Sequence, residues 1–169
     1  MSHADTPETP AAVPVGTLMA GKRGVVMGVA NDRSIAWGIA QSVAAQGAEL
    51  CFTYQGEALE KRVRPLAEQI GSRLVLPCDV TDDASVDAVF EQVKAEWGGL
   101  DFLVHAIGFA DKQFLRGRYM DTPRDAFLQA MDISVYSFVS VAQRAVPLMK
   151  PGGTLLTCLL YTSPSPRDS

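Results

Sequence analysis

The sequence has few of the residues that build metal sites or disulfide frameworks. It contains three cysteines and two histidines, and Cys51, Cys78 and Cys158 show no Cys-x-x-Cys spacing. An odd cysteine count with this spacing predicts neither a disulfide framework nor a zinc site. Cys51 and Cys78 lie in apolar runs, where a thiol usually behaves as a small buried hydrophobic group. We therefore expect no metal.

The sequence also lacks an excess of positive charge and a long hydrophobic run. Its net charge of −4 argues against nucleic acid or an anionic membrane surface as the main partner. No window is long enough to span a bilayer, and the first twenty residues lack the basic start and apolar stretch of a secretory signal. We expect a cytoplasmic protein with one domain.

Composition divides the chain into three parts. Residues 1–20 are rich in Pro, Ala and Thr and are predicted to form a flexible tail. Residues 21–158 are predicted to form an ordered domain. Residues 159–169 contain YTSPSPRDS, which has no apolar period where a further helix is expected. This segment is either a natural polar terminus or sequence foreign to the domain. We favour the second, because a parallel sheet should not stop with one edge uncovered.

Between residues 21 and 158 the hydrophobic pattern alternates between the strand and helix types. Short apolar runs predict strands at 24–29, 48–54, 73–80, 100–108 and 153–158, and helical periods predict helices at 34–47, 57–71, 81–97 and 123–150. Ser34 is a suitable N-cap and Gly47 a suitable stop. Pro65 should kink or restart its helix, and the Pro-Gly-Gly at 151–153 should end the longest one. The order predicts an α/β fold, a doubly wound parallel sheet (Rossmann) truncated after about the fifth strand.

In such sheets ligands bind beyond the carboxyl ends of the strands. After the first strand, Gly28 allows a tight turn, and helix amides near Ser34 and Ile35 can receive a pyrophosphate. Gly38 is expected to let that helix pack closely on the sheet. An ordinary strand-to-helix turn remains the alternative, because the Gly-x-Gly-x-x-Gly motif is absent.

The ends of the second and third strands suggest an adenosine site. Gln55 stands where many dinucleotide sites place an acid, and no Arg or Lys adjoins it to hold a 2′-phosphate. This favours NADH over NADPH. Asp79 can accept a hydrogen bond from the adenine amino group while Val80 packs on the ring. Asp79 could equally be a helix-capping carboxylate.

The end of the fourth strand offers small and apolar groups to the nicotinamide side of the site. Ala106, Ile107 and Gly108 follow one another there. His105 lies in an apolar strand with no acid or nucleophile near it in sequence. It is therefore interpreted as a buried structural imidazole rather than a catalyst.

Five segments resemble the bacterial NADH-dependent enoyl-[acyl-carrier-protein] reductases, a family within the short-chain dehydrogenases. They are GVANDRSIAWGIAQ, TYQGEAL, LPCDVTDDASVDAVF, DFLVHAIGFA and MDISVYSF, in order between about Gly21 and Thr157. The resemblance implies an oxidoreductase of type II fatty-acid synthesis that transfers hydride from NADH to an enoyl thioester on acyl carrier protein. It also implies a homotetramer, a substrate contact at Ala110, and NADH contacts at Gly28, Ser34, Ile35, Gln55, Asp79, Val80 and Ile107.

The sequence departs from this family where the chemistry is expected. The family's catalytic Tyr-x6-Lys pair follows the fifth strand, but Tyr161 has no lysine behind it. No catalytic residue is therefore assigned, and the chain alone is expected to be inactive. Tyr54, Tyr119 and Tyr136 are interpreted as packing or loop residues.

Two other functions remain open from the sequence. One is a different NAD(P)-dependent short-chain dehydrogenase acting on ketones or alcohols, against which the GVANDRSI turn and the HAIG segment argue. The other is a non-catalytic nucleotide-binding half-domain, which the missing Tyr-x6-Lys pair favours.

Overall fold

A parallel five-stranded sheet forms the centre of the chain in the computed structural model, which describes residues 13–158. Its strand order is β3-β2-β1-β4-β5. The strands are β1 (Arg23–Met27), β2 (Glu49–Tyr54), β3 (Leu74–Pro77), β4 (Leu100–His105) and β5 (Met149–Thr157). The order runs outward in both directions from the β1–β4 pair, so the chain reverses its direction of winding there. The doubly wound parallel fold is confirmed.

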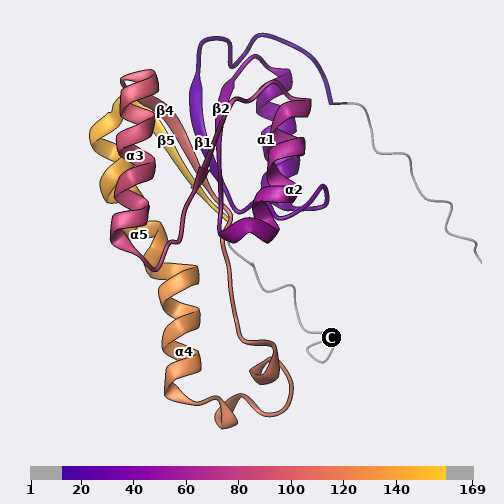
Figure 1. Cartoon of the computed structure of the whole chain (residues 1–169), viewed down its shortest axis with the longest axis vertical. Coiled ribbons are helices and arrows are strands. Elements are labelled where there is room, and N and C mark those ends of the chain that lie inside the picture. Colours follow the sequence, from indigo (N-terminus) through magenta and orange to yellow (C-terminus); the bar gives the residue numbers. More distant parts are fainter. Residues whose placement is uncertain (1–12, 159–169) are drawn as a thin grey trace, which may run out of the picture.

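Helices cover both faces of this sheet (Figure 1). One face carries α1 (Ile35–Ala45) and α2 (Gly56–Gln69), and the other carries α3 (Asp83–Trp97) and α5 (Ser137–Ala145). Alternation along β1 explains both cores, because Val25 and Met27 pack with α3 and α5 while Val26 packs with α1 and α2. The helix α4 (Arg124–Met131) extends past the carboxyl ends of the strands.

The structure differs from the restart expected at Pro65 and from the helix end expected at Pro151. The helix α2 runs from Gly56 to Gln69 without restarting at Pro65, whose exposed position lets solvent reach the carbonyl that loses its partner. The predicted 123–150 helix ends earlier than Pro151. Pro147 lacks the N–H that would continue α5, so the chain passes through a short 3₁₀ turn, η4 (Val146–Leu148), and enters β5 at Met149. The same region contains a π-helical turn, η3 (Asp132–Tyr136), between α4 and α5.

Part of the predicted amino-terminal tail lies against the folded body. The N–H groups of Gly16 and Met19 donate to the carbonyls of Ala45 and Gln46, at the end of α1. The remaining tail residues, 1–12, and the segment 159–169 lie outside the described residues, so both predictions about them stay predictions. Within residues 13–158, no helix is long and apolar enough to cross a membrane.

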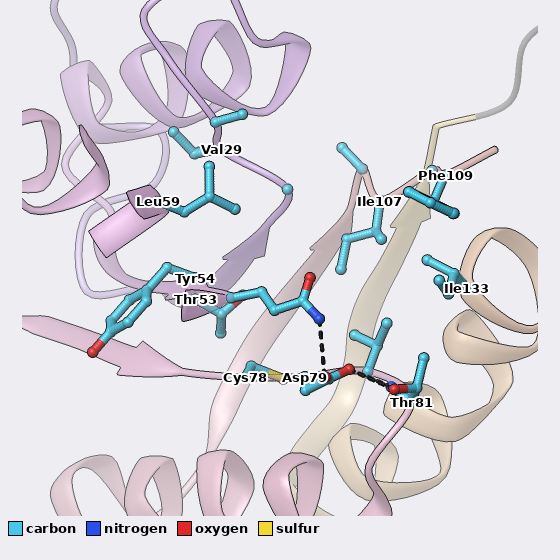
Figure 2. Close-up of a pocket in the computed structure, with 16 residues that line it drawn as sticks. Val29, Thr53, Tyr54, Leu59, Cys78, Asp79, Thr81, Ile107, Phe109 and Ile133 are labelled. Atoms are coloured by element: carbon cyan, nitrogen blue, oxygen red, sulfur yellow. Dashed lines mark hydrogen bonds between the residues drawn. The ribbon is translucent and has the colours of Figure 1, made fainter. Parts of the chain in front are cut away.

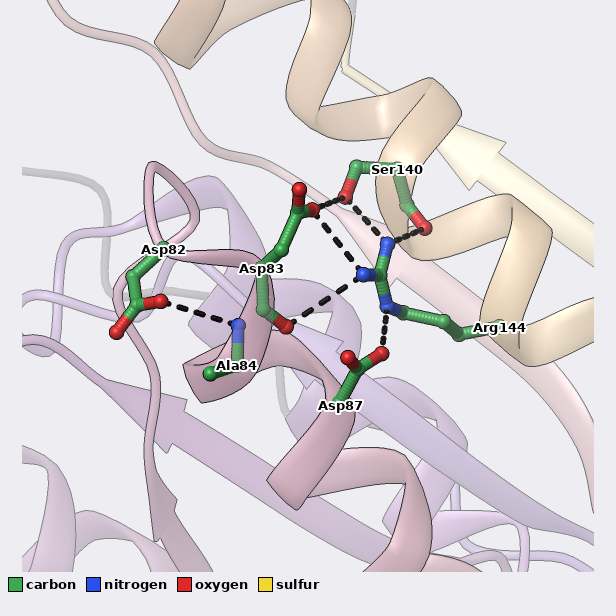
Figure 3. Close-up of polar contacts among 6 residues, drawn as sticks. All are labelled: Asp82, Asp83, Ala84, Asp87, Ser140 and Arg144. Carbon is green, nitrogen blue, oxygen red and sulfur yellow. Dashed lines mark hydrogen bonds and ion pairs between the residues drawn. The ribbon is translucent and has the colours of Figure 1, made fainter.

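A guanidinium joins α5 to α3 on one face of the sheet (Figure 3). Arg144 donates from Nε to Asp87 Oδ1 and from Nη2 to Asp83 Oδ1 at 3.1 Å, and Nη1 donates to the Ser140 hydroxyl and carbonyl. The Arg144 side chain is 19% exposed, whereas both carboxylates are mostly exposed. One half-shielded cation therefore holds two carboxylates of the neighbouring helix.

Replacing Arg144 by Met should lower the free energy of unfolding by about 1 kcal/mol, the upper end for partly exposed ion pairs. A matched control is Arg118→Met, because Arg118 pairs with Asp121 within one exposed turn. That change should cost less, because solvent screens an ion pair in an exposed turn. Urea unfolding of both variants measures the difference. Equal losses in the free energy of unfolding would show that the link between α3 and α5 does not stabilise the fold.

Candidate functional site

A cleft opens at the carboxyl ends of the strands, beside the β1–β4 pair (Figure 2). Segments from four strand ends contribute to it, together with α2 and the π-helical turn η3. Its lining residues are Gly28, Val29, Ala30, Thr53, Tyr54, Gln55, Leu59, Cys78, Asp79, Val80, Thr81, Ala106, Ile107, Gly108, Phe109 and Ile133. The strand ends therefore converge on one crevice, as ligand sites in doubly wound sheets require.

Gly28 is placed where a side chain cannot fit. Its φ is +102°, and a Cβ built there would lie 2.1 Å from the carbonyl oxygen of Ala106. The end of β1 and the end of β4 are thus in backbone contact at the floor of the cleft. A glycine at this position lets a flat ligand approach the main chain closely. This cradle fits a dinucleotide, which places its pyrophosphate against backbone at such a turn.

The turn after Gly28 is closed by Ser34, but not as expected. Ser34 stands at the N-cap position of α1, yet its hydroxyl accepts from the N–H groups of Ala30 and Asn31, both at 3.0 Å. The hydroxyl therefore shapes the turn rather than capping the helix. The first helix amide bonded back to the turn is that of Trp37. The amides of Ile35 and Ala36 precede it and are the groups that could face an anion.

The prediction that Gly38 lets α1 pack on the sheet was wrong. Gly38 lies on the exposed face of α1, and a Cβ built there meets nothing within 4 Å. Ala36, Trp37 and Ala40 make the buried contacts instead. A helix has one buried face, and the aromatic ring of Trp37 next to Gly38 fixes which face it is.

Gln55 and Asp79 point toward each other across the cleft (Figure 2). The amide Nε2 of Gln55 donates to Asp79 Oδ2 at 2.9 Å, and Asp79 Oδ1 accepts from the Thr81 N–H and hydroxyl. These hydrogen bonds, those from Thr81 above all, hold the pKa of the Asp79 carboxyl below its ordinary value. Because an ionised carboxylate only accepts, the Gln55 amide must turn its NH₂ toward Asp79. Its carbonyl oxygen is then free for the cleft.

The alternative role of Asp79 as a helix cap does not hold. The cap of α3 is Asp82, whose side chain accepts from the N–H of Ala84. Asp79 lies three residues earlier, and its N–H donates to the Ser85 hydroxyl oxygen. The Asp79 carboxylate therefore stays on the cleft side of the turn.

Cys51 and Cys78 are both buried, as predicted, and Cys78 lines the cleft. Burial raises the pKa of the Cys51 thiol to about 12 and that of Cys78 to about 11, where the charge of Asp79 adds to the effect. Both thiols stay protonated at neutral pH and are poor nucleophiles. Cys78 therefore contributes apolar surface to the cleft and no chemistry.

His105 is buried behind the cleft, which confirms its structural interpretation. It is 1% exposed, and its ring lies 5.5 Å from that of Phe138. The Ser137 hydroxyl donates to the Ile133 carbonyl, so it accepts from His105 Nε2 at 2.8 Å. Nδ1 then accepts from the Thr157 hydroxyl at 3.3 Å. This assignment leaves a neutral imidazole, in line with a pKa that burial lowers below the ordinary 6.5.

The free energy of unfolding should therefore fall as the pH falls below 6.5. Below pH 6.5 His105 binds a proton in the unfolded chain but stays neutral in the folded chain. The contribution of His105 to the free energy of unfolding is therefore complete above pH 6.5 and is lost as the pH falls below it. The maximum slope is about 1.4 kcal/mol per pH unit. Urea unfolding between pH 7.5 and 5 measures it, and His105→Gln should flatten the profile. An equal slope in wild type and variant would contradict the buried neutral imidazole.

The structure thus brings most of the predicted contact residues together. Gly28, Gln55, Asp79, Val80 and Ile107 line one cleft. Three others do not line it: Ser34 supports its turn, Ile35 is 62% exposed at the start of α1, and Ala110 is half-buried beyond Phe109.

Several contributors were not predicted. Tyr54 lines the cleft although it was assigned to packing, whereas Tyr119 and Tyr136 are exposed in turns. Ile133 reaches the cleft from η3, far along the chain. Ile133 belongs to the family-like segment MDISVYSF, but a helical period carries no sign of a π turn, so the sequence did not place Ile133 at the cleft.

Comparison with known proteins shows the family of the chain. The family model described as enoyl-(acyl carrier protein) reductase matches residues 28–165. An enoyl-[acyl-carrier-protein] reductase [NADH] of Rhizobium meliloti is 64% identical over 140 residues, which cover 83% of this chain and 52% of that protein. A reductase of the same name from Synechocystis is 51% identical and is covered to 57%. The chain spans about half the length of the curated relatives it matches.

Solved structures show the same fold. The reductase of Anaplasma phagocytophilum, solved in complex with NAD, has a TM-score of 0.82 at 55% identity, over 86% of this chain and 56% of that one. The FabI protein of Candidatus Liberibacter asiaticus has a TM-score of 0.82 at 49% identity, over 85% and 55%. The fold, the cleft and the family match agree, and the chain belongs to the enoyl-(acyl carrier protein) reductase family.

Proposed function

We propose that this chain is the cofactor-binding part of an NADH-dependent enoyl-[acyl-carrier-protein] reductase. The observation that carries the proposal is the cleft itself, where Gly28 exposes backbone beside β4 and the Gln55–Asp79 pair lies across from it. NADH, when bound, supplies the hydride that reduces the double bond of an enoyl thioester. The residues described here bind and orient that cofactor.

Each part of the cleft suits one part of NADH. The Gly28 turn and the first amides of α1, at Ile35, would receive the pyrophosphate. Asp79 and Val80 would hold the adenine, and Gln55 would accept from a ribose hydroxyl. Ile107 would lie against the nicotinamide, and Ala110 near the acyl chain.

The preference for NADH over NADPH follows from charge. A 2′-phosphate beside Gln55 would face the free amide oxygen and the ionised Asp79 carboxylate, both of which repel an anion. A 2′-hydroxyl instead donates to that oxygen. The acyl carrier protein as partner, a homotetrameric assembly and a cytoplasmic location belong to the same proposal.

The test uses the gene product, by which we mean the polypeptide encoded by the gene that contains this segment. We expect it to oxidise NADH with a crotonyl thioester and to be inactive with an acetoacetyl thioester. Absorbance at the NADH band measures both reactions. Consumption of the acetoacetyl substrate alone would replace the proposal with a ketone reductase, and NADH binding without either reaction would indicate a non-catalytic protein.

A further inference from the structure

The cleft wall formed by Gly108 and Phe109 has no regular secondary structure of its own. The β4 strand ends at His105, and the backbone of the next residue, Ala106, donates back to the Met27 carbonyl. Gly108 and Phe109 line the cleft beyond that bond. A loop of this kind is mobile unless other groups tie its backbone down.

One side chain ties both polar groups of Phe109. The Phe109 N–H donates to the Ser134 hydroxyl oxygen at 3.0 Å, and the same hydroxyl donates to the Phe109 carbonyl at 3.1 Å. The two residues are 25 positions apart in sequence. A single serine thus satisfies the donor and the acceptor of the residue at the outer end of the wall.

Ser134 is delivered by the π-helical turn η3. Such turns insert one residue into a helix, re-aim the side chains within it, and are frequent at functional sites. The preceding residue, Ile133, also lines the cleft (Figure 2). The turn therefore presents an apolar side chain to the cleft and the adjacent hydroxyl to the loop.

The turn is itself held from the buried side. The Ser137 hydroxyl donates to the Ile133 carbonyl at 2.6 Å and accepts from His105 Nε2. His105 is the last residue of β4, so its side chain fixes the turn and its backbone begins the loop. Ser137 and His105 are both 1% exposed or less, so water does not compete for the bond between them.

We propose that Ser134 is a positioning residue that holds the Gly108–Phe109 wall in the shape that receives the nicotinamide end of the cofactor. The inference rests on the proposed function, and it adds that η3, through Ser134, sets this wall. Without the hydroxyl the wall samples several shapes, and the binding-competent fraction falls.

The experiment compares Ser134→Ala, Ser134→Thr and Ser42→Ala in the gene product. Ser42 is the matched control, an exposed helical serine on α1 whose hydroxyl donates to the Gly38 carbonyl. For Ser134→Ala we expect the KM for NADH to rise about five- to tenfold, because the competent fraction falls. The kcat should change less than twofold, about the level of noise between variants. Ser134→Thr keeps the hydroxyl and should restore most of the affinity.

Amide hydrogen exchange gives a second readout that needs neither substrate nor cofactor. The Phe109 N–H should exchange at least about fivefold faster in Ser134→Ala than in Ser42→Ala, because its acceptor is gone. Failure of the gene product to reduce enoyl thioesters would defeat the proposed function. The exchange test would still decide whether Ser134 holds the Gly108–Phe109 wall. Unchanged exchange at Phe109, or an equal rise in KM in the Ser42 control, would overturn the inference.

Discussion

Replacing Gly28 by alanine should abolish detectable NADH binding and lower the free energy of unfolding by about 3–5 kcal/mol. Two costs act together. The left-handed φ of +102° is strained for any residue with a Cβ, and that Cβ would lie 2.1 Å from the Ala106 carbonyl oxygen. Backbone of a paired strand end cannot move aside as a flexible side chain can. The β1 and β4 ends must separate, and the cradle between them is lost.

Urea unfolding and calorimetric titration with NADH measure these two losses. Gly38→Ala is the matched control, since it makes the same change in α1 with nothing within 4 Å of the new methyl group. It should stabilise the chain by up to about 1 kcal/mol, the helix preference of alanine over glycine. If Gly28→Ala unfolded like the wild type and still bound NADH, the close approach of the two strand ends would not matter.

Replacing Gln55 by arginine should shift the cofactor preference toward NADPH by about ten- to a hundredfold. A charge-assisted hydrogen bond to the 2′-phosphate is worth about 1.5–3 kcal/mol, which corresponds to that range of dissociation constants. The gain in NADPH affinity is limited, because the Asp79 carboxylate, which lies 2.9 Å from Gln55 Nε2, will also attract the new guanidinium. The added change Asp79→Asn should therefore increase the shift further.

The ratio of kcat/KM for NADPH and NADH in the gene product measures the shift. Gln69→Arg adds the same charge at the far end of α2, on an exposed position, and should leave the ratio unchanged. An increase with Gln69→Arg equal to that with Gln55→Arg would mean that net charge, and not contact with the 2′ position, sets the preference.

Most of the fold could be predicted from the hydrophobic pattern. A parallel strand buried on both faces is a continuous apolar run, and the VVM within β1 and the FLV within β4 show it. Boundaries in the last third were less accurate, because the pattern indicated the Pro-Gly-Gly at 151–153 as the end of the longest helix. In the structure α5 ends at Ala145, and Pro147 in the following 3₁₀ turn lacks the N–H that would continue it.

Only part of the candidate site could be predicted from the sequence. Residues at strand ends, such as Gln55 and Asp79, are found by topology, because parallel strands bring their carboxyl ends to one edge. Ser34 stands at the predicted N-cap position of α1, but its hydroxyl bonds the N–H groups of the preceding turn and none of the helix. Ser134 lies in the family-like segment MDISVYSF, but its contact with Phe109 could not be predicted, because its partner is a backbone group 25 residues away.

The sequence by itself determined the alternation of strands and helices, the neutral amide at position 55 and the family resemblance. Each of these depends only on the types of residues that lie close together in the sequence. Tertiary structure decided which atoms meet. Only the packing of β1 against β4 shows that Gly28 leaves no room for a Cβ, and only the ionised Asp79 carboxylate fixes the direction of the Gln55 amide. Contacts of this kind depend on the distance between segments, which local patterns do not record.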